Sequence, residues 1–226
     1  MKIALIIQAR MGSHRLPGKS MMELCGEPLV YRIIERIKRC SRLDEIILAI
    51  PDQSLDDDLA NLGAKAKVNV FRGSENNVLD RFYKAASFAE ADFVLRFPAD
   101  NFAPEPSEID RLIEFHISEN PEGFSTNLTN VFDSGYPDGI GAEMFNFYNL
   151  EKAWKNPSTE NQKEHVHLNF FDYSSESIVD KKNCPVKTIS CPIEFRRPDL
   201  VLDVNEKCQF TYARSLYEAL YPINNN

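Results

Sequence analysis

The sequence predicts an α/β fold, a three-layer sandwich in which helices cover both faces of a mostly parallel central sheet. Three largely apolar runs, at 3–7, 45–50 and 93–97, show no regular alternation of apolar and polar residues, as expected for strands buried on both faces. Segments with apolar residues at helical spacing separate these runs, which gives four β-α units in the first half of the chain. The 226 residues suffice for one large domain but not for two of typical size.

Each element of the first half has a local signal. Apolar residues that share one helical face predict a helix that begins near Pro28. Ser54 and Asp57 form a capping-box pattern that predicts the start of the next helix, with Asp56, Asp57 and Asp58 as first-turn acids favoured by the helix dipole. The expected elements are a strand over 2–7, a helix over 28–37, a strand over 45–50, a helix from 54 toward 63, a strand over 68–71, a helix over 76–89, a strand over 92–97 and a helix over 107–117.

The pattern changes in the second half of the chain. From Phe124 onward, short apolar runs are broken by Gly and Asp, which predicts mixed strands and loops rather than further parallel units. We therefore expect a small mixed α+β appendage to the main domain. Its expected elements are strands or loops over 124–128 and 140–147, helices over 149–155 and 160–171, strands over 186–189, 193–195 and 201–204, and a helix over 206–220.

Composition narrows the class of protein. The net charge of −8 repels nucleic acid backbones, so we expect no nucleic acid partner. The five cysteines are odd in number and form no C-x-x-C pair, which predicts reduced thiols and a cytoplasmic protein. No apolar run approaches membrane-spanning length, and the first apolar run is too short for a signal sequence, so we expect neither membrane insertion nor export.

The first strand leads into a loop over 8–19, called here the first loop, which combines two glycines with Arg10, Arg15 and Lys19. Ligands of open α/β sheets lie beyond the carboxyl ends of the strands. Glycine lets backbone N–H groups turn toward an anion, and the three cations can neutralise several phosphate oxygens. The first loop is therefore predicted to bind a nucleotide triphosphate; the alternative is a basic surface turn.

The spacing of the first loop excludes two named phosphate-binding motifs. A Walker A loop needs four residues between its first Gly and the Gly-Lys pair, but five separate Gly12 from Gly18. The dinucleotide fingerprint needs three glycines, and only these two are present. Neither a Walker A site nor a dinucleotide site is expected.

Asp100 is the second predicted anchor of the site, because it comes just after the buried strand over 92–97. An Asp at this position can reach a divalent metal that bridges the phosphates of a nucleotide in the first loop. The alternative is a turn or helix-capping Asp. His165 and His167, two residues apart, do not share a helical face, so a two-His metal site is not expected there.

Seven segments in order carry a family resemblance. They are 8–19, Val70-Phe71-Arg72-Gly73-Ser74, Val78-Leu79-Asp80-Arg81-Phe82, Ala99-Asp100, Tyr136-Pro137-Asp138-Gly139, Glu164-His165-Val166 and Leu202-Asp203. Together they resemble the cytidylyltransferases that make CMP-activated sugars, the CMP-sialate and CMP-Kdo synthetases. The sequence is most similar to the SpsF-type spore coat polysaccharide biosynthesis proteins. The resemblance implies a single nucleotide-diphospho-sugar transferase-like domain of the GT-A or Rossmann-like type.

The resemblance also implies an activity. The expected reaction transfers CMP from CTP to a sugar acid or related acceptor, with release of pyrophosphate, during synthesis of surface polysaccharide or glycan precursors. It implies Mg²⁺, or Mn²⁺, bound by Asp100 and Asp203, and a homodimer. Residues 1–120 then form the nucleotide-binding half, 121–200 the acceptor-site and dimerisation region, and 201–226 a returning strand with the C-terminal helix.

Individual roles follow from the same resemblance. The implied catalytic residues are Arg15, Lys19, Asp100 and Asp203. The implied nucleotide-binding residues are Gln8, Ala9, Arg10, Gly12, Ser13, Arg15, Lys19, Arg72, Asp80 and Asp100, with Arg81 a further candidate beside Asp80 unless the pair is simply exposed. The implied acceptor-binding residues are Tyr136, Asp138, Gly139, Glu143, Glu164 and His165.

Two alternatives stay open. The family usually has a small polar residue where this chain has Pro98, which removes a backbone donor and a potential contact to the base. This departure is consistent with altered base specificity or with a nucleotide-binding homologue that lacks catalysis. A glycosyltransferase would use a D-x-D motif, which Asp56 and Asp58 spell, although these two residues lie in a predicted helix rather than after a strand.

Overall fold

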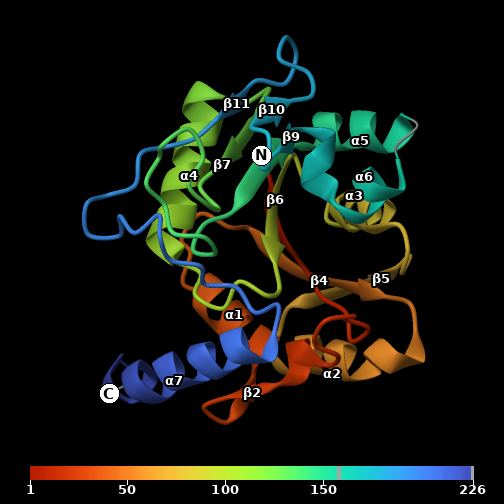
Figure 1. Cartoon of the computed structure of the whole chain (residues 1–226). Coiled ribbons are helices and arrows are strands. Elements are labelled where there is room, and N and C mark those ends of the chain that lie inside the picture. The colour runs from red at the N-terminus through yellow and green to blue at the C-terminus, as the bar shows by residue number, and fades with distance from the viewer. Residues whose placement is uncertain (157–158, 225–226) are drawn as a thin grey trace.

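The computed structural model describes residues 1–156 and 159–224 and has helices on both faces of a seven-stranded sheet (Figure 1). Neighbouring strands are parallel except around β8, which is antiparallel to β6 and β7. The α/β fold class and the mostly parallel central sheet are thereby confirmed. Along the sheet the order is β11 (Val186–Lys187), β7 (Phe124–Thr126), β8 (Glu143–Asn146), β6 (Phe93–Pro98), β1 (Ile3–Gln8), β4 (Glu45–Pro51) and β5 (Asn69–Gly73).

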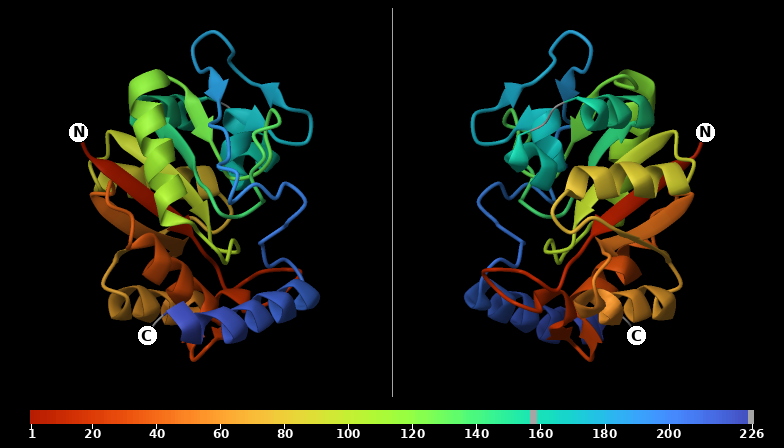
Figure 2. Two further views of the ribbon diagram at one scale, coloured as in Figure 1. Left: turned by 90° about the vertical axis from the view of Figure 1, so that its left-hand side faces the viewer. Right: turned by 90° about the vertical axis from the view of Figure 1, so that its right-hand side faces the viewer.

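The central strands are buried on both faces, as their continuous apolar runs predict. In β1, Leu5 and Ile7 belong to one apolar core, whereas Ala4 and Ile6 belong to the other. The first core packs against α1 (Leu29–Ile37), α2 (Asp57–Lys65), α4 (Pro106–Glu119) and α7 (Lys207–Asn224), and the second against α3 (Val78–Phe88) and α5 (Phe147–Lys155). Figure 2 shows α7 lying along the bottom of the molecule, on the side of α1 and α2.

The predicted capping box at Ser54 is wrong. Residues Ser54–Asp56 form a 3₁₀ turn, and α2 begins at Asp57 with no capping hydrogen bond from a side chain. Asp56 is instead buried, and its Oδ1 accepts the backbone N–H of Met11 at 2.8 Å. The helix also continues past Gly63, where a Cβ would lie 2.4 Å from the side chain of Val70 in β5. A glycine there lets α2 pack closely on the sheet.

Three predictions in the second half also differ from the structure. The helix expected over 160–171 ends early, since α6 covers only Glu160–Glu164 and a 3₁₀ turn, Val166–Asn169, follows. The segment 193–195 is a turn rather than a strand. The segment 201–204 makes only isolated bridges, from Val201 to Asp138 and from Asp203 to Asn101. Two small hairpins complete the fold: β2 (Glu23–Leu24) with β3 (Glu27–Pro28), and β9 (Phe171–Asp172) with β10 (Ser177–Ile178).

Across the described parts of the chain, none of the helices is both long enough and apolar enough to cross a membrane. All five cysteines are free thiols.

Candidate functional site

A cleft of about 660 Å³ opens at the carboxyl ends of β1 and β6. One wall is the first loop, another is the start of α3, and the third consists of segments from the second half of the chain. The strand ends contribute Gln8 from β1 and Pro98 from β6. The cleft therefore lies where the sequence predicts a ligand, beyond the carboxyl ends of parallel strands.

Hydrogen bonds within the first loop and to Asp56 and Ser20 hold it in place. Its Met11 N–H is bound by Asp56, and the Gly18 N–H donates to the Met11 carbonyl at 3.1 Å. Gly18 adopts φ +71°, a left-handed conformation that suits glycine. The Ser20 hydroxyl donates to the Arg10 carbonyl at 3.2 Å. These contacts fix the short 3₁₀ turn Lys19–Met21 and hence the direction of the Lys19 side chain.

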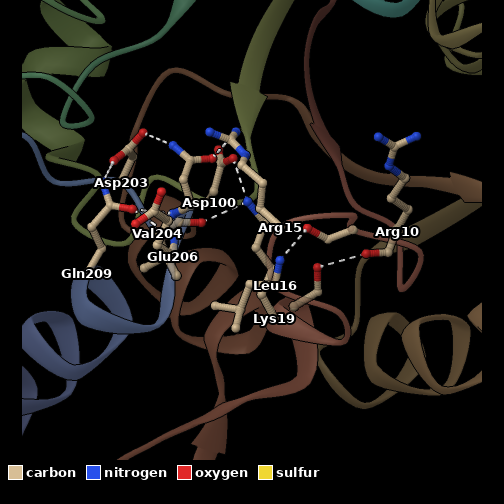
Figure 3. Close-up of polar contacts among 12 residues, drawn as sticks. Arg10, Arg15, Leu16, Lys19, Asp100, Asp203, Val204, Glu206 and Gln209 are labelled. Carbon is tan, nitrogen blue, oxygen red and sulfur yellow. Dashed lines mark hydrogen bonds and ion pairs between the residues drawn. The ribbon is translucent and has the colours of Figure 1, made fainter.

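Lys19 connects the first loop to the acids on the other side of the cleft (Figure 3). Its Nζ donates to Asp100 Oδ2 at 2.8 Å and to the Val204 carbonyl at 2.7 Å. The side chains of Lys19 and Asp100 are 14% and 28% exposed, so the pair is partly shielded from water. Arg15 Nη2 donates to Asn205 Oδ1 at 2.5 Å. Two cations of the first loop thus meet the segments that carry Asp100 and Asp203.

Asp100 and Asp203 come together although they lie far apart in the sequence. The Val204 N–H donates to the Asp100 carbonyl at 2.9 Å, next to the Asn101–Asp203 bridge. Burial raises the pKa of Asp203, the negative charge of Asp100 raises it further, and Lys19 and Arg15 act in the opposite direction. Both acids line the cleft.

Asp138 brings a third carboxylate to this end of the cleft. Burial raises its pKa to about 6, with further contributions from the charges of Asp203 and Asp100. Its backbone pairs with the segment around Leu202, since the Leu202 N–H donates to the Asp138 carbonyl at 2.9 Å. The three acids therefore share one region of negative potential.

Asp100 and Asp203 fit a hard divalent cation that arrives with a phosphate. Within the described residues there is no group of three or more His, Cys, Asp or Glu side chains placed to hold a metal ion unaided. Mg²⁺ usually binds through one or two carboxylates together with substrate phosphates and water. The oxygen donors of these two acids match that requirement, and the Gln209 amide, which donates to Asp203 Oδ1 at 2.9 Å, orients one of them.

A buried polar network forms the floor of the cleft on the side of β8. Arg96 Nη1 donates to Glu143 Oε2 at 2.7 Å, and the Tyr173 hydroxyl donates to Glu143 Oε1 at 2.8 Å. The side chains of Arg96 and Glu143 are only 7% and 0% exposed. Burial raises the pKa of Tyr173 well above its ordinary value and lowers that of His167 to about 4, so both are neutral at pH 7.

The three cationic side chains of the first loop do not lie together. Arg10 Nη2 lies 3.2 Å from Glu164 Oε1 in α6, and Figure 3 shows the Arg10 side chain extending away from the Lys19 and Asp100 group. Arg81 of α3, which also lines the cleft, lies near Arg10. One end of the cleft therefore holds Arg15 and Lys19 with the acids, and the other holds Arg10 and Arg81.

The structure brings most of the predicted site residues into the cleft lining. These are Gln8, Ala9, Arg10, Ser13, Arg15, Lys19, Asp100, Asp138, Glu143, Glu164, His165 and Asp203.

Three residues predicted to bind the nucleotide lie outside that lining. Arg72 pairs with Asp52 and Asp57 beside α2. The Asp80 carboxylate accepts the indole N–H of Trp154 at 2.9 Å and pairs with Lys84, so it joins α3 to α5. Gly12, within the first loop, is also absent from the lining.

Two residues predicted to contact the acceptor make close contacts within the fold and are absent from the cleft lining. Tyr136 is fully buried, and its hydroxyl donates to Glu108 of α4. Gly139 has φ +101°, and a Cβ there would lie 2.8 Å from the Leu202 carbonyl. Gly139 thereby allows the chain to pass close to the segment that carries Asp203.

Sequence reasoning missed several residues that line the cleft: Arg96, Asn101, His167 and Tyr173. A charged residue inside an otherwise apolar run over 93–97 was a signal for Arg96. The spacing of His165 and His167 bears only on a two-His metal site and gives no signal that His167 lines a cleft. Tyr173 lies in a hairpin that the sequence did not predict, and no local signal pointed to it.

Comparison with known proteins gives a consistent family assignment. A family model described as cytidylyltransferase matches residues 4–216. The chain is 40% identical over 166 residues to the uncharacterized protein MJ1063 of Methanocaldococcus jannaschii, a match that covers 74% of this chain and 65% of that protein. It is 30% identical over 225 residues to the spore coat polysaccharide biosynthesis protein SpsF of Bacillus subtilis, covering 96% of this chain and 86% of SpsF.

Solved structures share the fold. A cytidylyltransferase from Leptospira borgpetersenii superposes with a TM-score of 0.84 at 24% identity, covering 97% of this chain and 88% of that one. A CMP:2-keto-3-deoxy-manno-octonic acid synthetase complexed with CTP superposes with a TM-score of 0.66 at 16% identity, covering 97% and 99%.

Proposed function

Because this chain belongs to the cytidylyltransferase family, we propose that it transfers CMP from CTP to a sugar acid or related acceptor and releases pyrophosphate. One observation carries the proposal: Lys19 of the first loop contacts Asp100 directly, at the end of the cleft where Asp100 and Asp203 meet. Cations beside a pair of carboxylates suit a ligand that combines a triphosphate with a divalent cation.

The donor side of the reaction needs positioning and charge neutralisation more than covalent help. An acceptor oxygen attacks the α-phosphorus of CTP, the bond to the β-phosphate breaks, and pyrophosphate leaves. Arg15 and Lys19 neutralise the phosphates that depart as pyrophosphate. The rest of the first loop, from Gln8 to Ser13, holds the remainder of the nucleotide.

Asp100 and Asp203 are the proposed ligands of Mg²⁺ or Mn²⁺, together with oxygens of the triphosphate. When bound, such an ion supplies electrophilic polarisation of the α-phosphate. In this structure Lys19 Nζ donates a hydrogen bond to Asp100 Oδ2, an oxygen that could otherwise bind the metal ion. Lys19 therefore exchanges Asp100 for phosphate oxygens when the nucleotide enters, and we assign no general base.

The acceptor is proposed to bind over the floor formed by Glu143 and its neighbours, beside Asp138, Glu164 and His165. Support for a sugar acid comes from the relative named as a synthetase of CMP-2-keto-3-deoxy-manno-octonic acid. Support for a role in surface polysaccharide precursors comes from the name of SpsF. A glycosyltransferase D-x-D site has no comparable support, because Asp56 is buried and bound to the Met11 amide.

We also propose a cytoplasmic location and a homodimer. The free state of all five cysteines and the need for CTP support the location. The family resemblance supports the homodimer, with residues 121–200 as the dimerisation region. Size-exclusion chromatography with light scattering tests the oligomer, and a monomer mass would refute it.

Pyrophosphate release tests the reaction. The purified protein is incubated with each of CTP, UTP, ATP and GTP, with Mg²⁺ and a panel of sugar acids, sugars and sugar phosphates. We expect pyrophosphate only with CTP and one class of acceptor. Lys19→Ala serves as the negative control. Release of pyrophosphate from another nucleotide would indicate that base specificity has changed, as expected from Pro98. If no combination of nucleotide and acceptor releases pyrophosphate, the proposal is refuted.

A further inference from the structure

Three arginines of the described chain are buried to more than nine-tenths: Arg32, Arg81 and Arg96. Arg32 pairs with Glu35 at 2.9 Å, and Arg96 pairs with Glu143 at 2.7 Å. Arg81 is the most buried, at 2% exposure, yet no ion pair to it is found among the described residues. A buried charge normally has a partner of opposite charge, because an isolated charge pays a large desolvation penalty.

The guanidinium of Arg81 has unused hydrogen-bonding capacity. Its Nη1 donates to the Ser74 carbonyl at 2.5 Å, while its Nε is buried and has no partner in the described part of the chain. The residue lines the cleft from α3, three positions after Val78. A donor left unpaired at the wall of a cleft marks a place where a ligand can supply the acceptor.

The charges around Arg81 are of both signs. Burial and the charge of Arg10 together lower the pKa of Arg81 to about 10, although Asp56 and Glu75 act in the opposite direction. Asp56 is already engaged by the Met11 amide. Arg10 itself pairs with Glu164, but this pair is half exposed on the Glu164 side and is open to exchange. An anion between the two guanidinium groups would relieve their repulsion.

We propose that Arg81 and Arg10 form an oxyanion subsite, distinct from the end of the cleft where Lys19 meets Asp100. Its ligand is a phosphate or carboxylate group, supplied either by the nucleotide or by the acceptor. Glu164 pairs with Arg10 and releases it when the anion binds. That the anion belongs to the nucleotide or to the acceptor rests on the proposed function, whereas the binding of an anion at this subsite does not.

Equilibrium binding without turnover tests the subsite. Affinities of cytidine, CMP, CDP, CTP and inorganic phosphate are measured by calorimetry for the wild type, Arg81→Met, Arg10→Met and Glu164→Gln. Arg42→Met is the matched control, because it removes the same charge from an exposed arginine paired with Glu114. Phosphate is measured with the protein free and saturated with CTP.

The expected result is a loss of affinity of about tenfold to a hundredfold in both arginine variants, the usual range for a charged hydrogen bond. If the arginine variants bind cytidine as the wild type does but bind CMP, CDP or CTP more weakly, the nucleotide supplies the anion. If the nucleotides bind normally but phosphate no longer binds the CTP-saturated protein, the acceptor supplies it. Glu164→Gln should strengthen anion binding, because it removes the competing carboxylate. Arg42→Met should leave all affinities unchanged.

Stability separates a binding role from a structural one. Arg81→Met should not lower the melting temperature of the unliganded protein, because it leaves no buried carboxylate unpaired. Wild-type affinities for the nucleotides and for phosphate in both arginine variants would overturn the proposal. An equal loss for cytidine, which has no phosphate, would also overturn it. If Arg81→Met does not fold, Arg10→Met and Glu164→Gln still give opposite expected shifts. Anion binding that depends on Arg81 without CMP transfer would refute the proposed function alone.

Discussion

Replacing Glu143 with Gln should destabilise the protein more than most single substitutions. Glu143 is fully buried, and each of its carboxylate oxygens accepts one hydrogen bond, from Arg96 at 2.7 Å and from Tyr173 at 2.8 Å. The amide retains the volume of the carboxylate but removes its charge. Arg96, whose side chain is 7% exposed, then becomes a buried cation without a counter-ion.

Breaking a buried ion pair from one side typically costs about 3–5 kcal/mol of unfolding free energy. For a domain of this size, 1 kcal/mol shifts the melting temperature by about 2–4 °C, so we expect a decrease of about 6–20 °C. Differential scanning calorimetry of Glu143→Gln at pH 7 measures it.

Two further variants isolate the charge effect. Tyr173→Phe removes the hydrogen bonds of the hydroxyl to Glu143 and Thr126 and keeps the ion pair, so it should cost only about 1–3 kcal/mol. The double variant Glu143→Leu with Arg96→Met removes both charges and should recover much of the loss, because apolar replacements of a buried pair are often tolerated. A melting temperature within about 3 °C of wild type for Glu143→Gln would refute this reasoning.

Three further predictions follow from the acid end of the cleft. Lys19→Ala and Asp100→Ala should each lower turnover by about a hundredfold or more while circular dichroism stays unchanged, since Lys19 neutralises the phosphates and Asp100 binds the divalent cation in the proposed complex; full activity in either variant would exclude that role. The pKa of Asp138 is raised from 3.8 to about 6 by burial and by the neighbouring acids, so its stabilising contribution is present below pH 4 and is lost as pH rises through 6. The free energy of unfolding of Asp138→Asn should therefore exceed that of the wild type by about 3 kcal/mol at pH 8 and should equal it at pH 3.5, as measured by urea titration; equal stability at pH 8 would contradict the assignment. Gly139→Ala should cost about 1–3 kcal/mol and reduce turnover, because its Cβ would meet the Leu202 carbonyl next to Asp203; a wild-type melting temperature would show that this backbone can shift freely.

The parallel half of the fold was predictable because its signals are local and redundant. Continuous apolar runs marked the central strands, and helical spacing marked the segments between them. The short elements after Phe124 carried weaker signals. The helix expected over 160–171 ends at Glu164 because the following residues turn into a 3₁₀ segment and then pair as a hairpin with Ser177–Ile178. Such pairing depends on tertiary contacts that periodicity does not encode.

The candidate site was predictable in part, for a geometric reason. The carboxyl ends of parallel strands lie at one edge of a sheet, so a loop after the first strand and an acid after another can be expected to meet. Tyr136 shows the limit of this reasoning, since its hydroxyl is bound by Glu108 of α4, a partner that no local pattern identifies. Arg81 carried an overlooked signal: it lies three residues after Val78 and four before Ala85, both buried, and therefore on the inward face of α3.

Exposure separates the ion pairs of the cleft into those that a ligand can exchange and those that it cannot. A charged ligand can replace one partner of a pair only if water or the ligand solvates the partner that is released. The freed acids would be Asp100 and Glu164, whose side chains are 28% and 50% exposed, whereas Glu143 is completely buried. The pairs of Lys19 with Asp100 and of Arg10 with Glu164 can therefore open toward phosphates or an acid group. The pair of Arg96 with Glu143 stays closed and sets the shape of the floor of the cleft.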